Sequence, residues 1–336
     1  MTEDIAVLGD YELDLEKAVE AILRARAGKI LVQLPEGLKR YYPVVSNYIR
    51  DRTSLDLEVY LDASPAYGSC LIDPELVRGY DLVLHIGHDP YPLTPRPSSN
   101  VVFLDLEYVG TDLRAILEKL EMLLRDVGAV SIAIATTNQH KKLSKRIRDE
   151  LTSAGFSVVA GPAVALGCYI PLDLRVIADA VVVVAGGLFH AISLGMTARS
   201  SVIIRVDPYT RDVSNVSRDI YRFLSKRLKK MSEALEARSW GVLIGTASQY
   251  RPQVVDRFVK LLSERGLTYY LYVAPVLTVE VLRNLDSPNV GAYVVTSCPR
   301  VAVDDLYDFE KPVLTPPEAV RVLMRGDVSE YPDSFL

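Results

Sequence analysis

Three cysteines, Cys70, Cys168 and Cys298, are the residues of this sequence best suited to chemistry. Soft thiolates bind iron–sulfur clusters, copper(I) or zinc. The cysteines lie 98 and 130 residues apart, so there is no local metal-binding loop and only the fold can bring them together. Three thiolates on a cubane cluster would leave one iron without a protein ligand, and a substrate can bind there. From the pattern alone, isolated core or loop thiols are the more common case.

A structural zinc site is a poor match, because zinc normally takes four protein ligands. The sequence has four histidines, and none has ligand-like spacing to a cysteine: His85, His88, His140 and His190. Each cysteine instead follows a short apolar run that predicts a buried strand, and each has small residues or proline beside it. The contexts are Tyr67-Gly68-Ser69-Cys70, Leu166-Gly167-Cys168 and Ser297-Cys298-Pro299.

The composition is that of an ordinary globular protein, with 336 residues of which 49% are hydrophobic and 24% charged. The net charge of −5 lacks the basic excess of proteins that grip nucleic acid, so we expect no direct nucleic-acid binding. The chain shows neither a leader pattern nor an apolar run long enough to span a membrane. Three cysteines are too few for a disulfide framework and indicate a reducing compartment. We therefore expect a cytoplasmic protein without membrane contact.

The predicted strands and helices repeat three times in the same order. The first strands of the three repeats begin at Ile30, Ile132 and Val242, which gives domain-sized periods of 102 and 110 residues. Amphipathic helices are predicted before and after each of these strands. The predicted strands are 29–34, 57–62, 81–88 and 101–106; then 131–136, 157–160, 180–185 and 202–206; then 241–246, 268–273, 291–296 and 311–315.

This alternation predicts an α/β protein of three tandem related domains, 1–107, 108–210 and 211–336, each a small parallel sheet flanked by helices. Ligands of such sheets gather at the carboxyl ends of the strands, where all three cysteines lie. Cys70 and Cys168 follow the second strand of their repeats, but Cys298 follows the third. We expect a pseudo-threefold arrangement around a central cluster, with ligands that are not equivalent.

Several stretches together resemble the archaeal diphthamide synthase family, a radical 3-amino-3-carboxypropyl transferase that starts diphthamide formation on elongation factor 2. The stretches are 33–38, 66–73, 136–140, 166–168 and 296–300, with Asp304 and Asp305. The family often has two adjacent cysteines where this chain has Ser69-Cys70, a departure that leaves the ligand itself intact. The resemblance implies three related α/β domains, each giving one catalytic cysteine, Cys70, Cys168 or Cys298, to a 4Fe-4S cluster.

The resemblance also implies a mechanism. The open iron engages S-adenosylmethionine, one electron breaks the bond between its sulfur and the Cγ of the methionine moiety, and the aminocarboxypropyl radical adds to an imidazole carbon of the target histidine. The Cys-x-x-x-Cys-x-x-Cys motif of ordinary radical enzymes is absent from this chain. The protein then has to place the cofactor, tune the cluster potential and exclude water.

The turns after the three first strands are candidates for the cofactor pocket, because backbone N–H groups at a helix N-terminus suit a carboxylate. The candidate residues are Gln33, Pro35, Gly37, Thr136, Gln139, Thr246 and Gln249. The alternative is simple helix capping by these turns. Arg300, two residues after Cys298, is a candidate for bidentate pairing with the cofactor carboxylate, or else for an ion pair with Asp304 or Asp305.

The expected partners are elongation factor 2 as protein substrate, an electron donor, and a second copy of the chain. We expect a homodimer because a chain with all three cysteines need not borrow a cluster from a paralogue. Two alternatives remain at this point. One is a quinolinate synthase-like enzyme, which also has three related α/β domains around a three-cysteine cluster, and the other is a non-catalytic scaffold or partner subunit.

Overall fold

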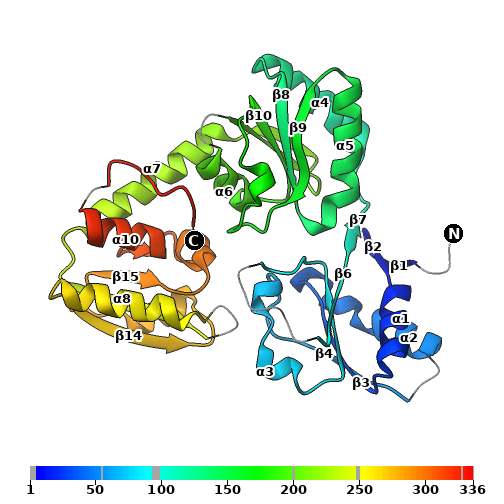
Figure 1. Ribbon diagram of the computed structural model, residues 1–336, viewed down its shortest axis with the longest axis horizontal. Coiled ribbons are helices and arrows are strands. Elements are labelled where there is room, and N and C mark those ends of the chain that lie inside the picture. Colours follow the sequence, from blue (N-terminus) through cyan, green and yellow to red (C-terminus); the bar gives the residue numbers. More distant parts are fainter. Residues whose placement is uncertain are drawn as a thin grey trace.

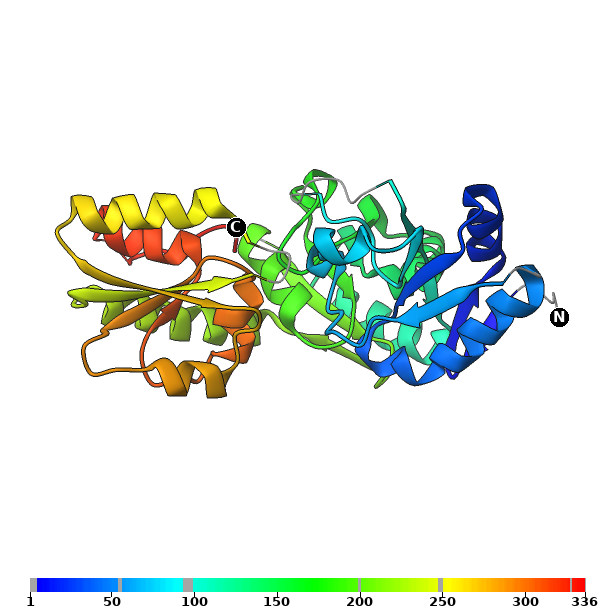
Figure 2. The ribbon, with the colours of Figure 1, turned by 90° about the horizontal axis from the view of Figure 1, so that it is seen from below.

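The structure is a computed structural model that describes residues 5–53, 56–92, 99–198, 201–246, 250–326 and 328–335. It has three lobes, each built on a sheet of its own, and the lobes meet near the centre of the molecule (Figure 1). We call them the first, second and third unit in chain order. The first and third units lie at opposite ends of the molecule in Figure 2.

The first unit contains a four-stranded parallel sheet in the order β4-β3-β5-β6. Its strands are β3 (Lys29–Gln33), β4 (Glu58–Leu61), β5 (Leu82–Ile86) and β6 (Val101–Leu104). Its helices are α1 (Glu16–Ala25), α2 (Tyr42–Thr53) and the short α3 (Pro74–Val77), with 3-10 turns at Glu36–Tyr41 and Ser69–Leu71.

The second unit has the sheet order β12-β11-β10-β8-β9, in which only β12 runs antiparallel. Its strands are β8 (Ser131–Thr136), β9 (Ser157–Val164), β10 (Ala180–Val184), β11 (Val202–Asp207) and β12 (Asp212–Asn215). Its helices are α4 (Leu113–Asp126), α5 (Lys141–Ser153) and α6 (Phe189–Thr197), with 3-10 turns at Asn138–His140 and Leu172–Leu174.

The third unit is again a four-stranded parallel sheet, in the order β14-β13-β15-β16. Its strands are β13 (Ser239–Gly245), β14 (Thr268–Ala274), β15 (Ala292–Val295) and β16 (Val313–Leu314). Its helices are α7 (Ser217–Ala234), α8 (Pro252–Glu264), α9 (Val279–Leu285) and α10 (Pro316–Arg325), with a π-helical turn at Val301–Asp305.

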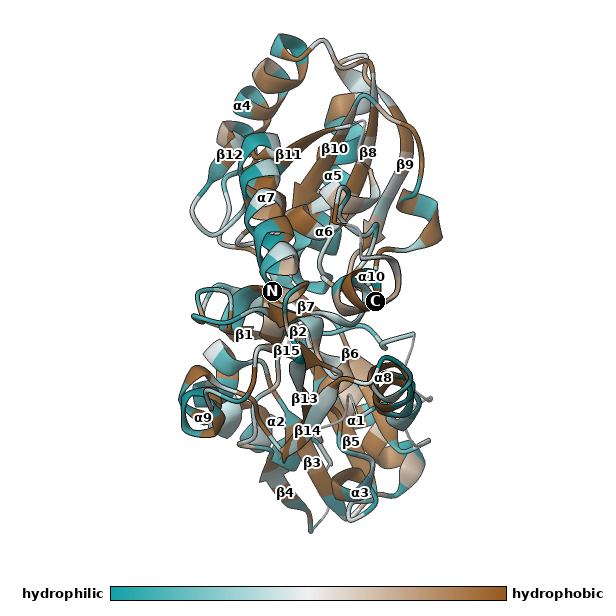
Figure 3. Ribbon diagram, turned by 90° about the vertical axis from the view of Figure 1, so that its left-hand side faces the viewer, coloured by the Kyte–Doolittle hydropathy of each residue, from teal (hydrophilic) through white to brown (hydrophobic). Residues whose placement is uncertain are grey.

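All three sheets place the second strand of the unit at one edge, then the first, the third and the fourth. The predicted α/β class with small parallel sheets flanked by helices is therefore confirmed, whereas the pseudo-threefold arrangement stays a prediction. Helices on both faces bury the central strands, which explains why they are continuous apolar runs. Every residue of β10, for example, is buried, and β8 and β10 are brown in Figure 3.

An additional antiparallel sheet joins β1 (Ile5–Leu8), β2 (Tyr11–Asp14) and β7 (Leu106–Tyr108), which the sequence did not predict. The expected boundary after residue 107 falls inside β7, and the one after residue 210 falls between the paired strands β11 and β12. Strand pairing thus joins residues on both sides of each expected limit. The exact limits of the three domains stay a prediction.

The second and third units share one hydrophobic core, and the first and second units each have a further core of their own. The shared core contains Val181 from β10 and Val242 from β13, and the first unit contributes the buried Tyr91 to it. Tyr91 follows β5 and therefore reaches across from its own unit. No helix in the described part of the chain is both long and apolar enough to cross a membrane.

Candidate cysteine site and adjoining cavity

Cys70 lies in the 3-10 turn that follows β4. The hydroxyl of the buried Ser69 donates a hydrogen bond of 2.6 Å to the carbonyl oxygen of Asp89, which follows β5. The N–H of Leu71 donates to the carbonyl of Gly68 at 3.0 Å, and the Asp73 side chain caps α3. These contacts hold the cysteine between two strand ends of the first sheet.

Cys168 lies in a tight turn that requires glycine before it. The N–H of Cys168 donates to the carbonyl of Leu166 at 2.9 Å, which closes a three-residue γ-turn around Gly167, and Gly167 has a φ of +73°. A Cβ atom at this position would lie 2.5 Å from a ring carbon of Phe189. Glycine is therefore needed here for its backbone conformation and for space. Burial raises the pKa of the Cys168 thiol.

Cys298 follows β15 and begins the chain segment that leads into the π-helical turn. Its carbonyl accepts a hydrogen bond from the N–H of Val301 at 3.1 Å. Burial raises the pKa of the Cys298 thiol to about 11, and the nearby Cys168 contributes to the rise. The backbone N–H groups of Arg300 and Val301 act in the opposite direction, since they favour the thiolate.

Contacts between the units bring the three cysteine loops together. The Tyr91 hydroxyl lies 3.3 Å from the Sγ of Cys168, and burial followed by the charges of Cys168 and Cys70 raises the pKa of Tyr91. The guanidinium of Arg300 lies 5.5 Å from the ring centre of Tyr67, in the Cys70 loop. Tyr91 thus connects the first unit with Cys168, and Tyr67 connects the Cys70 loop with the segment after Cys298. Cys168 in turn lies close enough to Cys298 to raise the pKa of its thiol.

The arrangement does not form a site for a single metal ion. Among the described residues, no three His, Cys, Asp or Glu side chains are close enough to hold one ion. In a cubane cluster each thiolate binds a different iron, so the three sulfurs need only face one common space. All three cysteines are described, and none forms a disulfide.

Two residues of this site were not predicted from the sequence, Tyr91 and Arg251. The guanidinium of Arg251 donates to the carbonyl of Ser297 at 3.0 Å, and its positive charge favours the thiolate of Cys168. Its buried Nε has no hydrogen-bond partner among the described residues. Neither residue lies in a recognisable motif. Tyr91 reaches Cys168 from the first unit and Arg251 from the third, and nothing in the local sequence indicates these contacts.

A cavity of about 750 Å³ lies between the second and third units, next to two of the cysteines. Phe189 and His190 line it and also lie against Gly167, the residue before Cys168. On the opposite side Arg300 lines it, and its Nε donates to Asp304 at 2.8 Å. Further lining residues are the basic Arg222 and Lys226, the acidic Asp219 and Asp308, and the stacked rings of Phe223 and Tyr307. Paired charges and stacked rings suit a zwitterionic ligand with a planar group.

The structure assigns structural roles to several predicted cofactor residues of the first and second units. The amide of Gln33 is buried between Asp62 and His85, with contacts of 2.9 and 2.8 Å. The hydroxyl of Thr136 is buried and bonded to Ser144 and to its neighbouring carbonyl. Their positions do not support cofactor contact, because buried hydrogen bonds already use these groups.

The remaining candidates are distributed differently. Pro35 lies beside Gly87, and Gly37 is exposed in the first 3-10 turn. Thr246 is exposed at the end of β13, while Gln249 lies outside the described residues. Of the predicted cofactor residues that are described, Arg300 alone lines the cavity next to the cysteines.

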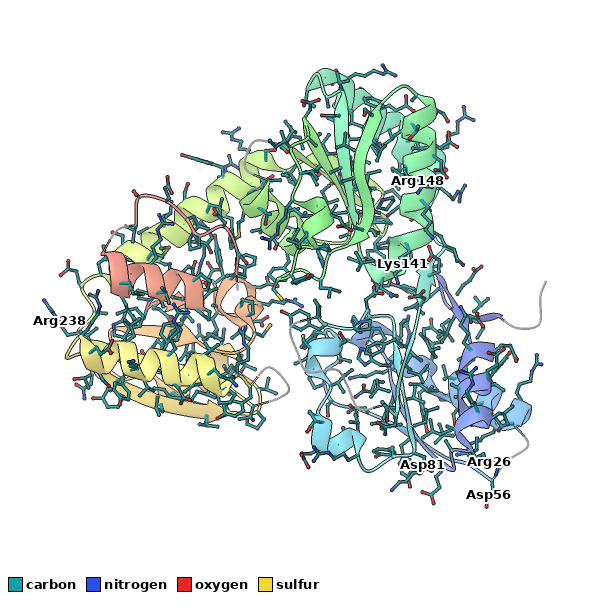
Figure 4. The ribbon with its side chains drawn as sticks, in the orientation of Figure 1. Arg26, Asp56, Asp81, Lys141, Arg148 and Arg238 are labelled. Carbon is teal, nitrogen blue, oxygen red and sulfur yellow. The ribbon has the colours of Figure 1, made fainter. Side chains whose placement is uncertain are left out.

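The predicted motif at 136–140 joins the first two units. Gln139 donates to the carbonyl of Gly87 at 2.8 Å, and the Asn138 amide donates to Asp89 and Asp105. Lys141 bridges the same two carboxylates at 2.7 and 2.8 Å, and Figure 4 labels it at this junction. This polar network joins the first two units in addition to the contact that Tyr91 makes with the core of the second unit.

A chain of buried hydrogen bonds orients His88, which follows β5. Gln33 donates to Asp62, so its carbonyl oxygen accepts from Nδ1 of His85, and Nε2 of His85 in turn accepts from Nδ1 of His88 at 3.1 Å. Burial lowers the pKa of His85 to about 3 and that of His88 to about 4. Both rings are therefore neutral near pH 7.

Comparison with known proteins relates the whole chain to one family. A model of the family described as "Putative diphthamide synthesis protein" matches residues 34–332. The 2-(3-amino-3-carboxypropyl)histidine synthase of Pyrococcus horikoshii is 30% identical over 340 residues, which cover 96% of this chain and 92% of that protein. Subunit 1 of the human enzyme of the same name is 29% identical, covering 97% of this chain and 75% of the human protein.

Solved structures give the same relationship. The crystal structure of Dph2 from Pyrococcus horikoshii with a 4Fe-4S cluster is 26% identical in sequence and superposes with a TM-score of 0.81. The match covers 98% of this chain and 94% of that chain.

Proposed function

Because the chain belongs to the diphthamide synthesis protein family, we propose that it transfers a 3-amino-3-carboxypropyl group from S-adenosylmethionine to a histidine imidazole. The relatives that match along nearly the whole chain are named for this product, and a matching structure contains a 4Fe-4S cluster. The observation that carries the proposal is that the cysteine-bearing loops of three different sheets contact one another, next to a cavity that Arg300 lines.

Cys70, Cys168 and Cys298 are the proposed ligands of the 4Fe-4S cluster. Their chemistry fits, because thiolates are the soft donors that iron–sulfur clusters prefer and the three cysteines lie on loops that contact one another. In the described part of the chain, no three His, Cys, Asp or Glu side chains could hold a single ion instead. When bound, the cluster supplies one electron for cleavage of the sulfonium. Cys168 is buried and Cys70 and Cys298 are half-buried, so their surroundings limit the access of water to this chemistry.

Arg300 is the proposed ligand of the S-adenosylmethionine carboxylate. Its Nε is used by Asp304, and its two terminal nitrogens have no hydrogen-bond partner among the described residues. These two nitrogens match a carboxylate in a planar, bidentate pair. Asp219 and Asp308 offer acceptors for the ammonium group in the same cavity, and the stacked Phe223 and Tyr307 offer an apolar surface for the adenine.

The protein substrate in this proposal is translation elongation factor 2, whose modified histidine starts diphthamide formation. The reaction needs an electron donor, which the chain itself does not provide. The active form is a cytoplasmic homodimer in which each copy contains a full set of three cysteines and three α/β domains, 1–107, 108–210 and 211–336.

Anaerobic reconstitution tests the proposal most directly. The protein should bind iron and sulfide, and the dithionite-reduced form should give the low-temperature EPR signal of a 4Fe-4S cluster. Separate assays should yield modified elongation factor 2 from S-adenosylmethionine, and no quinolinate from iminoaspartate and dihydroxyacetone phosphate. Changing any one of the three cysteines to Ala should remove the transferase activity, while Met122→Ala, on the exposed face of α4, should leave it unchanged.

The alternatives predict different results. Quinolinate formation would identify the other three-cysteine enzyme class. A colourless protein that binds no iron would point to a scaffold or partner subunit. Wild-type activity after loss of one cysteine would remove that residue from the ligand set.

A further inference from the structure

The strand β14 forms an unusually open edge of the third sheet. It is seven residues long, Thr-Tyr-Tyr-Leu-Tyr-Val-Ala, and contains no charged residue and no proline. Tyr270, Leu271 and Val273 are 40%, 50% and 67% exposed. Natural edge strands are normally short or carry charges, proline or bulges that prevent pairing with another chain. This strand has none of these protections.

The equivalent edges of the other two units are protected. β4 has only four residues and begins with the charged Glu58. β9 contains Pro162, which has no N–H, and its pairing with β8 shifts register twice. The three strands occupy the same place in the strand order, so the open edge is a particular property of the third unit.

The free backbone groups of β14 can be identified from its pairing with β13. The N–H of Thr268 donates to Arg238, and the carbonyl of Ala274 accepts from Thr246, so both residues point their backbone groups toward β13. Because the direction alternates along a strand, Tyr269, Leu271 and Val273 point theirs outward. In Figure 1, β14 forms the lower edge of the third unit, and Figure 2 shows this unit at the end of the molecule away from the N-terminus.

We propose that β14 pairs antiparallel with β14 of a second copy, through a twofold axis at Leu271, to form a continuous eight-stranded sheet. From the proposed function, this inference takes only the expectation that the protein is a homodimer. With the axis at Leu271, the outward-pointing residues pair with each other. Leu271 pairs with Leu271 of the second copy, and Tyr269 pairs with Val273 of the second copy. This register gives about six backbone hydrogen bonds, two for each directly opposed pair of this kind.

Side chains and charges favour a second copy as the occupant. Across the axis Tyr270 lies opposite Tyr272, a favourable aromatic cross-strand pair. A twofold interface brings equal charges together near its axis, and this strand has none there. The exposed Arg238 and Arg265 lie near the beginning of β14, and the exposed Glu280 follows its end. Antiparallel pairing brings the beginning of one strand beside the end of the other, so these opposite charges approach.

Substitution of Leu271 tests the surface in the full-length protein. Light scattering after size exclusion should give the mass of a dimer for the wild type and of a monomer for Leu271→Lys. The dissociation constant should rise about a hundredfold, because two like charges then face each other across the interface. The matched control is Val159→Lys on the protected edge strand β9, where 47% of the side chain is exposed. It should remain a dimer.

A charge exchange shows whether β14 contacts its own copy. Leu271→Lys and Leu271→Glu should each be monomeric, and an equimolar mixture should form a one-to-one dimer. This recovery also shows that both variants are folded. A dimer of Leu271→Lys alone, or a mixture that stays monomeric, would overturn the proposed pairing.

A monomeric wild type would also overturn it and would leave the edge to a strand of another protein. The transferase assay tests the proposed function separately from the dimer. An active monomer would contradict the homodimer alone, while a dimer without transferase activity would contradict the enzyme proposal and leave the surface intact.

Discussion

Removal of the Tyr91 hydroxyl is expected to lower the reduction potential of the bound cluster. Tyr91 comes from the first unit, and its hydroxyl lies 3.3 Å from the Sγ of Cys168 in the second. Burial raises the pKa of Tyr91, so the hydroxyl keeps its proton and would donate a hydrogen bond to the Cys168 sulfur when a cluster binds this cysteine as a thiolate. A donor to a ligand sulfur stabilises the reduced, more negative cluster more than the oxidised one.

The size of the shift follows from the strength of this hydrogen bond. A hydrogen bond to a charged acceptor contributes about 1.5 to 3 kcal/mol. If about a third of this differs between the two oxidation states, the change is about 0.5 to 1 kcal/mol, or about 20 to 45 mV for one electron. Tyr91→Phe keeps the ring in the shared core and removes the donor, so the potential should fall by about this amount.

The measurement is a redox titration of the reconstituted protein followed by EPR. Tyr169→Phe is the matched control, because Tyr169 is the residue after Cys168 and its ring centre lies 6.5 Å from that of Tyr91. Its own hydroxyl has no hydrogen bond to a cysteine among the described residues, so its potential should stay near that of the wild type. An unchanged or higher potential in Tyr91→Phe would refute the reasoning that this hydroxyl donates to a cluster ligand.

Three further predictions concern groups that support the site. Glu318→Gln should lower the free energy of unfolding in urea by about 3 to 5 kcal/mol, because it leaves the fully buried Arg227 without its ionic partner. A combined Arg227→Met, Glu318→Leu variant should recover much of the lost stability. An equally unstable double variant would argue against the unpaired charge as the cause. Burial raises the pKa of Glu107 to about 7, so its ionisation costs stability in the folded state and this cost grows as pH rises from about 4.5 to 7. Glu107→Gln should therefore gain about 1 to 3 kcal/mol relative to the wild type over that range, and a pH-independent difference would contradict the raised pKa. Gly167→Ala should lower the iron content of the reconstituted protein, because the strained φ and the blocked space displace Cys168; the control Gly128→Ala has a similar positive φ but free space around it, so full iron binding in both variants would show that the turn tolerates a side chain.

Much of the fold was predictable because each local signal has one dominant physical cause. Strands buried on both faces by helices must be apolar along their length, and this made the central strands of each unit recognisable. Some of the missed elements lack such a signal, whereas the missed α10 has one in its capping box of Thr315 and Glu318. α6 is apolar nearly all round, with five of its nine residues buried, so no helical period is visible. β1, β2 and β7 are short and pair across a long sequence separation.

The candidate site was predictable only in part. The cysteines were recognisable by residue type and by their place after strands, and Arg300 by its distance of two residues from Cys298. The turn at 136–139 looked like a cofactor loop, but its Asn138 and Gln139 side chains bond the first unit. A polar side chain at a strand end can bind a ligand or a neighbouring domain equally well. The sequence contains no information about which of the two lies beside it.

By itself, the sequence determined the α/β class, the threefold repetition of elements and the soft sulfur chemistry, because these depend on residue type and on spacing along the chain. Only the tertiary structure decided that the three cysteine loops meet, that Tyr91 and Arg251 approach Cys168, and that β14 remains an open edge. These properties depend on how separate sheets pack against each other, and the packing follows from the shapes of whole surfaces that no local pattern encodes.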